Sequence, residues 1–162
     1  MTHKRAVLLD TSFFLRFLND EDPLFNNADK YFRYFLQENI DMVISTISIA
    51  EYCVGGHIAE LPLKNLQIMP FNLKHAKRTG ELAKIAFTEK EKEKLQVNER
   101  KIIPNDTKLF AQADCEEYIK YYLSSDKQSF KVYKAINNKI NLKFEFLNLY
   151  IPYDQTFGIL DL

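Results

Sequence analysis

The chain has 162 residues, of which 46% are hydrophobic, and its 22 basic residues balance 22 acidic ones to a formal net charge of zero. This length and composition favour one domain with a hydrophobic core, and zero net charge excludes nucleic-acid binding through bulk positive charge alone. No apolar stretch approaches the roughly 20 residues of a membrane-spanning helix, so we expect a cytoplasmic protein that does not enter the membrane.

The first half of the chain alternates strand patterns with helical periodicity. Residues 6–9 form an entirely apolar run that predicts a buried strand, and Asp10 follows it directly. Helical patterns continue as far as residue 38. The run 41–45 predicts the second strand, and a helix that begins at Ser48 would carry Glu51 in its first turn.

The second half of the chain continues this alternation. We expect, in chain order, a strand at 66–70, helices over 74–87 and 106–113, a strand at 121–124, a helix over 129–138 and a strand at 142–147. Such alternation is typical of a parallel sheet covered by helices. We expect residues 1–147 to form one domain, on which the tail 148–162 packs. The charge run 88–94 indicates an exposed helical extension or a flexible loop, with a flap over the substrate as the functional interpretation.

Four acidic residues fall at related places in this pattern. Asp10 and Asp126 directly follow strands, Glu51 lies in the helix after the second strand, and Asp106 opens the helix before the fourth. The carboxyl ends of parallel strands meet at one edge of a sheet, where α/β folds bind their ligands. Taken singly, each acid also suits a helix cap, and Ser48 with Glu51 has the spacing of a capping box.

Taken together, four carboxylates on one rim would repel one another unless a cation lay between them. The three histidines are scattered along the chain, so zinc is disfavoured. Carboxylate oxygens suit a hard ion such as Mg²⁺ or Mn²⁺. An ion held in this way can activate water and neutralise charge on a phosphodiester, which points to a nuclease.

Lysines follow the last of these acids. In a helix that begins after Asp126, the positions of Lys127, Lys131 and Lys134 share one face. These lysines are candidates for binding RNA phosphates next to the cleaved one, with an affinity that weakens as salt rises. A solvated helix face explains the same spacing.

Four short motifs resemble those of PIN-domain ribonucleases in their order and spacing: 8–12 (LLDTS), 48–51 (SIAE), 106–113 (DTKLFAQA) and 124–126 (SSD). The resemblance runs from about residue 6 to residue 146. It implies an α/β, PIN-like three-layer sandwich with a central, mostly parallel five-stranded sheet flanked by helices. Each motif is weak alone, whereas the ordered set is fairly specific.

In that family, an acidic quartet binds Mg²⁺ or Mn²⁺ and hydrolyses RNA phosphodiesters. The resemblance therefore implies an endoribonuclease whose catalytic, metal-binding residues are Asp10, Glu51, Asp106 and Asp126. It assigns Thr11, Ser12 and Ser124 as supporting hydroxyls. Many small bacterial members are VapC-type toxins, usually dimeric and restrained by an antitoxin. It thus implies an RNA substrate, an antitoxin partner and a homodimer, although the stretch 88–104 and the tail exceed the compact toxin pattern.

Two other interpretations have different consequences. A haloacid-dehalogenase-like phosphatase also begins with an Asp after its first strand, but it needs a second Asp two residues later, where this chain has Ser12. The open alternative is a PIN-like RNA- or protein-interaction module with little or no nuclease activity. A binding module has no need of four mutually repelling acids, so the quartet favours the enzyme.

Overall fold

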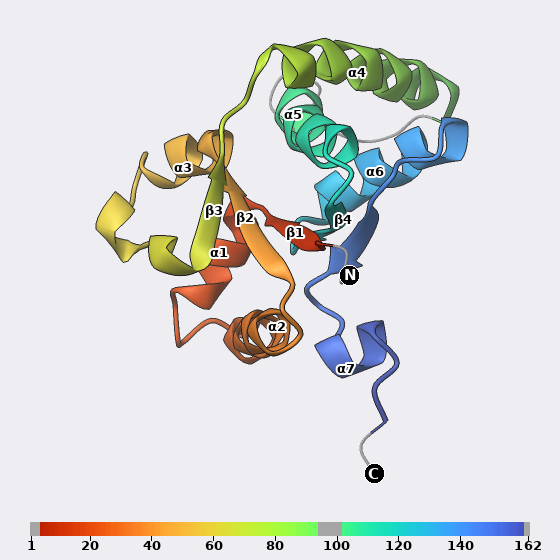
Figure 1. Ribbon diagram of the computed structural model, residues 1–162. Helices are drawn as coiled ribbons and strands as arrows, with labels where there is room; N and C mark the ends of the chain where they lie inside the picture. Colours follow the sequence, from red (N-terminus) through yellow and green to blue (C-terminus); the bar gives the residue numbers. More distant parts are fainter. Residues whose placement is uncertain (1–3, 94–101, 161–162) are drawn as a thin grey trace.

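The computed structural model describes residues 4–93 and 102–160 and shows one sheet of five strands between layers of helices (Figure 1). The strand order is β3-β2-β1-β4-β5, and every neighbouring pair is parallel. The strands are β1 (Ala6–Leu9), β2 (Asp41–Ser45), β3 (Leu66–Met69), β4 (Ile119–Ser124) and β5 (Glu145–Asn148). The predicted α/β class and five-stranded sheet are therefore confirmed, and the sheet is parallel throughout.

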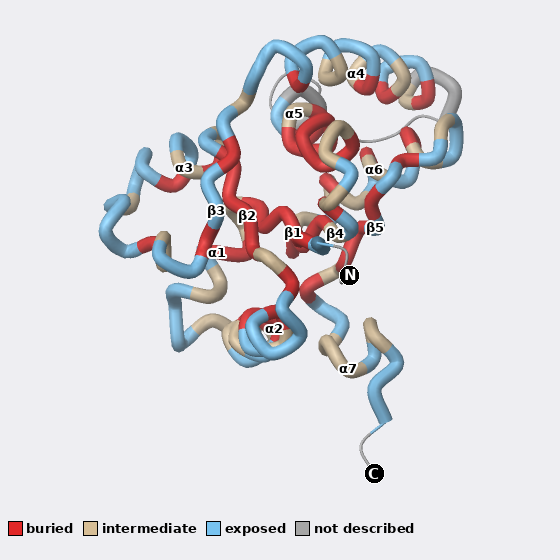
Figure 2. The backbone as a smooth tube through the Cα atoms, viewed as in Figure 1, coloured by how far each residue is buried: buried red, intermediate tan, exposed pale blue. Residues whose placement is uncertain are grey.

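The central strand explains why the sheet needs helices on both faces. All four residues of β1 are fully buried, and successive side chains point to opposite faces. Ala6 and Leu8 pack in one apolar cluster, and Val7 and Leu9 in another. Figure 2 shows β1 and most of β2 as buried, whereas the middle two residues of the edge strand β3 are exposed.

The helices divide between these two clusters. The first cluster joins the sheet to α4 (Leu73–Glu93), α5 (Ile102–Cys115) and α6 (Lys127–Lys139). The second joins it to α1 (Thr11–Phe17) and α2 (Phe25–Gln37), with Tyr52 of α3 (Thr46–Tyr52) at its border. Two short 3-10 helices, η1 (Ile58–Glu60) and η2 (Leu63–Asn65), precede β3. The arrangement is a three-layer sandwich, as predicted.

Several element boundaries differ from those predicted, and three of the differences concern α3, α5 and β5. Helix α3 begins at Thr46 because Ser45 at the end of β2 is its N-cap, accepting a hydrogen bond from the Ile47 amide. Helix α5 begins at Ile102, so Asp106 lies inside it rather than at its start. Strand β5 begins at Glu145 instead of residue 142. The first two changes alter how Glu51 and Asp106 reach the sheet edge.

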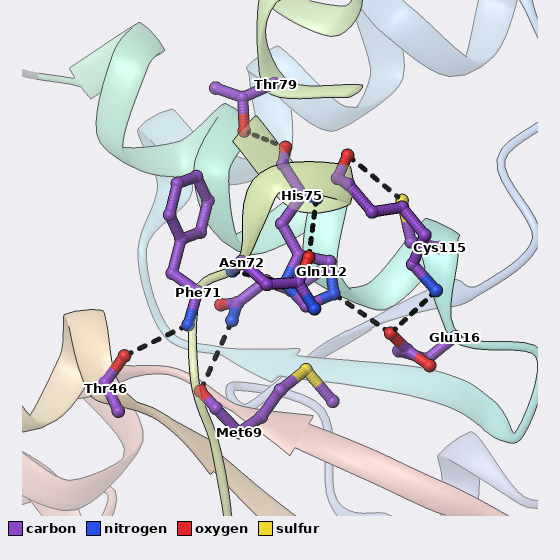
Figure 3. A network of polar contacts seen from close by, with 10 residues as sticks. Thr46, Met69, Phe71, Asn72, His75, Thr79, Gln112, Cys115 and Glu116 are labelled. Carbon is purple, nitrogen blue, oxygen red and sulfur yellow. Dashed lines mark hydrogen bonds and ion pairs between the residues drawn. The ribbon is translucent and has the colours of Figure 1, made fainter. Parts of the chain in front are cut away.

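A polar network fastens the start of α4 to the end of α5 (Figure 3). The Asn72 amide donates to Nδ1 of His75, and the His75 amide donates to Oδ1 of Asn72. Because Nδ1 accepts, Nε2 of His75 carries the proton and donates to Oε1 of Glu116 at 3.0 Å. Gln112 of α5 donates to the Met69 carbonyl at the end of β3. These contacts fix the position of the helix that carries Asp106.

The segment after β5 lies against α2. The Tyr31 hydroxyl is 2.6 Å from both the Ile151 carbonyl and the Thr156 hydroxyl. Phe157, which follows α7 (Tyr153–Thr156), stacks on Tyr34 with ring centroids 4.4 Å apart. These contacts thus hold the segment around α7 and Phe157 on the α2 layer.

The charge run 88–94 lies mostly in α4, which continues to Glu93. Glu89 is buried rather than solvated. Of this run only Lys94 lies outside the described residues, and the flap interpretation stays a prediction. In the described part of the chain, none of the helices combines the length and hydropathy that a membrane crossing requires.

Candidate active site

A pocket of about 270 Å³ opens at the carboxyl edge of the sheet. All four predicted carboxylates line it, although they come from segments far apart in the chain. Asp10 and Asp126 follow the central strands β1 and β4, whereas Glu51 and Asp106 extend from α3 and α5. The remaining lining residues are Thr11, Ser12, Leu15, Asn105 and Leu109. The structure therefore brings together the four acids that the sequence singled out.

Asp10 is buried at the base of this group. Its Oδ1 accepts hydrogen bonds from the Ser12 hydroxyl at 2.6 Å and from the Phe13 amide at 3.1 Å. Its Oδ2 accepts from the Ser124 hydroxyl at 2.5 Å. Burial raises the pKa of Asp10 to about 6; these hydrogen bonds oppose the rise, and the charge of Asp126 adds to it.

The two serines also hold the backbone beyond β4. Ser12 Oγ accepts from the Ser125 amide at 2.9 Å, and Ser124 Oγ accepts from the Asp126 amide at 3.0 Å. Each hydroxyl therefore donates to Asp10 and accepts from the segment that carries Asp126. The two serines therefore fix the orientation of the Asp10 carboxylate and the backbone that carries Asp126.

Glu51 is the exposed member of the quartet. It lies in the last turn of α3, so the predictions of a first-turn position and of a Ser48 capping box are wrong. Its Oε2 accepts a hydrogen bond from the Thr11 hydroxyl at 2.8 Å. Ser48 is buried, and its hydroxyl has no hydrogen-bond partner among the described residues. The contact with Thr11 holds Glu51 beside the pocket.

Asp106 has the most perturbed environment of the four. The residue is 9% exposed, and its Oδ2 is buried without a hydrogen-bond partner in the described part of the chain. It is therefore not a helix cap. Burial, followed by the negative charges of Asp126, Asp10 and Glu51, raises the pKa of Asp106 to about 8, while the Ser129 hydroxyl acts in the opposite direction.

Asp126 combines a place in the pocket with a structural contact. It is the N-cap of α6, and its Oδ1 accepts from the Gln128 and Ser129 amides at 2.9 and 3.3 Å. Asp10 likewise caps α1 through the Phe13 amide. The capping explanation from the sequence is therefore correct for these two acids, and it is compatible with a carboxylate that also faces the pocket.

The donor set suits a hard divalent cation. It consists of carboxylate oxygens, and a buried, unpartnered oxygen such as Oδ2 of Asp106 calls for a partner. Over residues 4–93 and 102–160, no group of three or more His, Cys, Asp or Glu side chains stands ready to hold a metal ion. Asp10 and Glu51 are instead engaged by Ser12, Ser124 and Thr11. A bound ion would have to share these carboxylate oxygens with the hydroxyl groups that now donate to them.

The three predicted RNA-binding lysines are exposed on α6. Lys127 directly follows Asp126, and its ammonium lies 4.8 Å from the centroid of the Tyr150 ring. Lys134 lies over the Phe130 ring at 4.9 Å. The helix that carries the three lysines thus starts at the pocket and leads away from it.

Several residues near the acids were not predicted. Leu15 and Leu109 give the pocket apolar walls, and Asn105 adjoins Asp106. Leu15 stands one helical turn after Thr11, a spacing that would have indicated the same face. Tyr122 is fully buried, with its hydroxyl 3.5 Å from Oδ2 of Asp10. Its position on a central strand, next to an acid on the neighbouring strand, becomes visible only in the fold.

Comparison with known structures finds proteins of similar fold. No family model and no curated protein matches the chain. VapBC2 of Rickettsia felis, bound to a DNA fragment from its promoter, matches 87% of this chain and 98% of its own with a TM-score of 0.58 and 20% identity. DNA-bound VapBC of Salmonella typhimurium matches 90% and 98% with a TM-score of 0.54 and 15% identity.

A third structure, the sarcin-ricin loop cleaving toxin VapC20 of Mycobacterium tuberculosis, matches 78% of this chain and 94% of its own. Its TM-score is 0.47 at 15% identity. At these identities the likeness concerns the fold. The protein thus has the PIN-domain fold of VapC-type proteins.

Proposed function

We propose that this protein is a metal-dependent endoribonuclease that hydrolyses RNA phosphodiester bonds. Its metal ligands would be the pocket carboxylates of Asp10, Glu51, Asp106 and Asp126, and the ion would be Mg²⁺ or Mn²⁺. The observation that carries this proposal is the buried Oδ2 of Asp106, which has no hydrogen-bond partner in the described residues, in a side chain whose pKa the charges of the other three carboxylates raise. A buried group of this kind is costly unless a ligand compensates it.

The residues of the chain prepare the pocket for this chemistry. When bound, the ion would supply a water of lowered pKa and neutralise charge on the phosphodiester. Ser12 and Ser124 orient the carboxylate of Asp10, and Thr11 orients Glu51. Asp106, whose pKa burial and the neighbouring carboxylates raise to about 8, would be a ligand of the ion in its deprotonated form. Leu15 and Leu109 add apolar side chains to the lining of the pocket.

RNA would approach along α6. Lys127, Lys131 and Lys134 are exposed on this helix, which begins beside Asp126. Their ammonium groups would pair with phosphates that flank the cleaved one. This arrangement supplies local positive charge in a chain whose net charge is zero.

We further propose that the ribonuclease is the toxin of a toxin–antitoxin pair, acts in the cytoplasm as a homodimer, and is restrained by an antitoxin. The VapBC assemblies that share its fold support this role. Finding an antitoxin gene beside this one, and co-purification of the two products, would support the pairing. A gene that stands alone, together with unimpaired growth of cells that overproduce the protein, would contradict it.

The test of the enzymatic proposal is cleavage of RNA by the purified full chain with Mn²⁺ or Mg²⁺ and with EDTA. We expect cleavage with either ion, none with EDTA, and a loss of at least 100-fold (about 2.7 kcal/mol of activation free energy) in Asp10→Asn. Asp20→Asn changes an exposed acid outside the pocket and serves as the control. Equal cleavage by Asp10→Asn and wild type would overturn the proposal.

One observation favours the alternative of a PIN-like interaction module. Asp10 and Asp126 both cap helices, so part of the acidic group has a structural use without any ion. Wild-type protein that binds RNA or a protein partner but cleaves nothing with either metal would establish this alternative.

A further inference from the structure

Tyr150 is an exposed aromatic side chain at the edge of the sheet where the carboxylates lie. It follows β5, whose carboxyl end points to the same edge as those of β1 and β4. In the described residues, the large hydrophobic side chains that are exposed include two aromatic ones, Phe87 on α4 and Tyr150, which is 41% exposed. Tyr150 does not line the pocket, but it leaves an aromatic ring partly open to solvent at the same edge of the sheet.

The backbone that presents Tyr150 is held from several sides. The Tyr150 amide donates to Oδ1 of Asn148 at 2.9 Å, and the Ile151 amide donates to the Asn148 carbonyl at 3.0 Å. The Asn27 side chain of α2 donates to the carbonyls of Leu149 and Tyr150 at 3.0 and 3.4 Å. The ring is therefore displayed from a fixed turn rather than from a loose tail.

The same turn is connected to the candidate active site. The Leu149 amide donates to the carbonyl of Ser124 at 2.9 Å, and the hydroxyl of Ser124 donates to Asp10. Lys127, next to Asp126, places its ammonium 4.8 Å from the Tyr150 ring centroid. The ring and the lysine thus form a pair at this edge of the sheet, next in the chain to Asp126 of the pocket lining. We call this pair the Tyr150–Lys127 platform.

We propose that the Tyr150–Lys127 platform binds one unpaired nucleobase of the RNA substrate. The base stacks on the tyrosine ring, and the lysine pairs with a phosphate of the same strand. Aromatic rings at protein surfaces bind single-stranded nucleic acid in this way, because every base presents a flat π-face. The platform would admit single-stranded RNA or loops and disfavour paired regions, where the bases are already stacked. This inference rests on the proposed ribonuclease function.

A second pair of the same kind provides a matched control. Lys4 places its ammonium 4.9 Å from the ring centroid of Tyr118. Tyr118 precedes β4, so this pair lies at the amino edge of the sheet, opposite the pocket. Tyr118 is partly buried against the first apolar cluster, so Tyr118→Leu, checked for an unchanged fold, removes the ring of a lysine–tyrosine pair without touching the proposed platform.

The test measures binding of a single-stranded 12-nucleotide RNA in EDTA, so that no cleavage occurs, with 2-aminopurine placed at each position in turn. We expect the wild type and Tyr150→Phe to quench the fluorescence of one position and to bind alike. Tyr150→Leu should lose that quenching and bind about 5- to 150-fold more weakly, the range for one stacked base. Tyr118→Leu should behave as wild type, and a duplex of the same sequence should show no effect of Tyr150→Leu.

Equal affinity and quenching in Tyr150→Leu and wild type would overturn the platform, as would a loss that is the same for duplex and single strand. Absence of any RNA binding by the wild type would overturn it as well. Cleavage with Mn²⁺ is scored separately. If the wild type cleaves RNA and Tyr150→Leu binds RNA as the wild type does, the platform alone is refuted. If the wild type cleaves nothing but Tyr150→Leu loses the quenching that the wild type shows, only the catalytic proposal is refuted.

Discussion

Ser124 donates a hydrogen bond of 2.5 Å to Oδ2 of Asp10, across 114 positions of the chain. The two residues stand at the carboxyl ends of the neighbouring parallel strands β4 and β1. The same hydroxyl accepts from the Asp126 amide. One buried side chain therefore sets the geometry of two of the four carboxylates, and the pocket depends on the pairing of the central strands.

Ser124→Ala should destabilise the protein and raise the pKa of Asp10 above its value of about 6. The alanine leaves the Asp126 amide and the Asp10 carboxylate without this partner, which costs about 1–3 kcal/mol of unfolding free energy. Urea denaturation and carboxyl NMR titration measure the two effects. Ser124→Thr keeps the hydroxyl and should restore both values; failure of the threonine to do so would show that the hydrogen bond is not the cause.

The raised pKa of Asp106 should make the free energy of unfolding depend on pH. Its folded pKa of about 8 exceeds the ordinary value of 3.8, so unfolding releases its proton between these two pH values. The free energy of unfolding should therefore fall as pH rises from about 4 to 8. Asp10, with a folded pKa of about 6, adds to the fall between about pH 4 and 6.

Asp106→Asn removes the larger part of this dependence. In EDTA, the variant should equal wild type near pH 4 and be more stable at pH 8, by up to a few kcal/mol. Urea denaturation at both pH values measures the difference, with Asp20→Asn as the exposed control. Parallel pH profiles for wild type and Asp106→Asn would mean that Asp106 titrates normally.

If the lysines of α6 bind RNA phosphates, they should contribute to the salt dependence of RNA binding. Replacing Lys131 and Lys134 together with alanine should weaken binding and reduce the slope of log K against log salt by roughly 0.7 for each phosphate that the variant no longer neutralises. Fluorescence anisotropy with single-stranded RNA at several salt concentrations gives the slope. The exposed pair Lys64 and Lys77, outside α6, is the control for charge alone. An unchanged slope would assign Lys131 and Lys134 to an ordinary solvated face.

Because Phe157 stacks on Tyr34, we expect the segment after β5 to contribute to the free energy of unfolding. Phe157→Ala removes a ring stacked at 4.4 Å and packed in the second apolar cluster. Because Phe157 is half-buried, we expect a loss of about 1–3 kcal/mol, below the cost of emptying a fully buried site. Leu160→Ala changes a side chain that is 83% exposed and should have no effect. Equal stability of the two variants would show that the tail does not contribute.

Much of the fold followed from short sequence patterns. The run Ala6–Leu9 is apolar throughout because it is buried on both faces, and the acid that ends it is therefore conspicuous. The start of α3 was harder to predict, because Ser45 and Ser48 both suit a helix cap. Burial decides between them: Ser45 ends β2 and caps the helix, whereas Ser48 packs inside.

The positions of Tyr150 and Tyr122 could not be predicted, because they depend on contacts between residues far apart in the chain. The tail is rich in apolar and aromatic residues, so the sequence predicts packing for all of them. Tyr150 faces solvent because Asn27, 122 positions before Leu149, holds the turn from the other side. Likewise, Tyr122 lies beneath Asp10 only through the register of β1 and β4.

The proposed ribonuclease function requires that the four carboxylates hold one hard divalent ion. The most direct measurement is the anomalous difference map of a crystal grown with Mn²⁺. We predict one peak in the pocket, within oxygen-ligand distance of Asp106 and of at least one of Asp10, Glu51 and Asp126, and no such peak in crystals of Asp106→Asn. A pocket that stays without manganese at saturating concentration, with Oδ2 of Asp106 still unpartnered, would contradict the account.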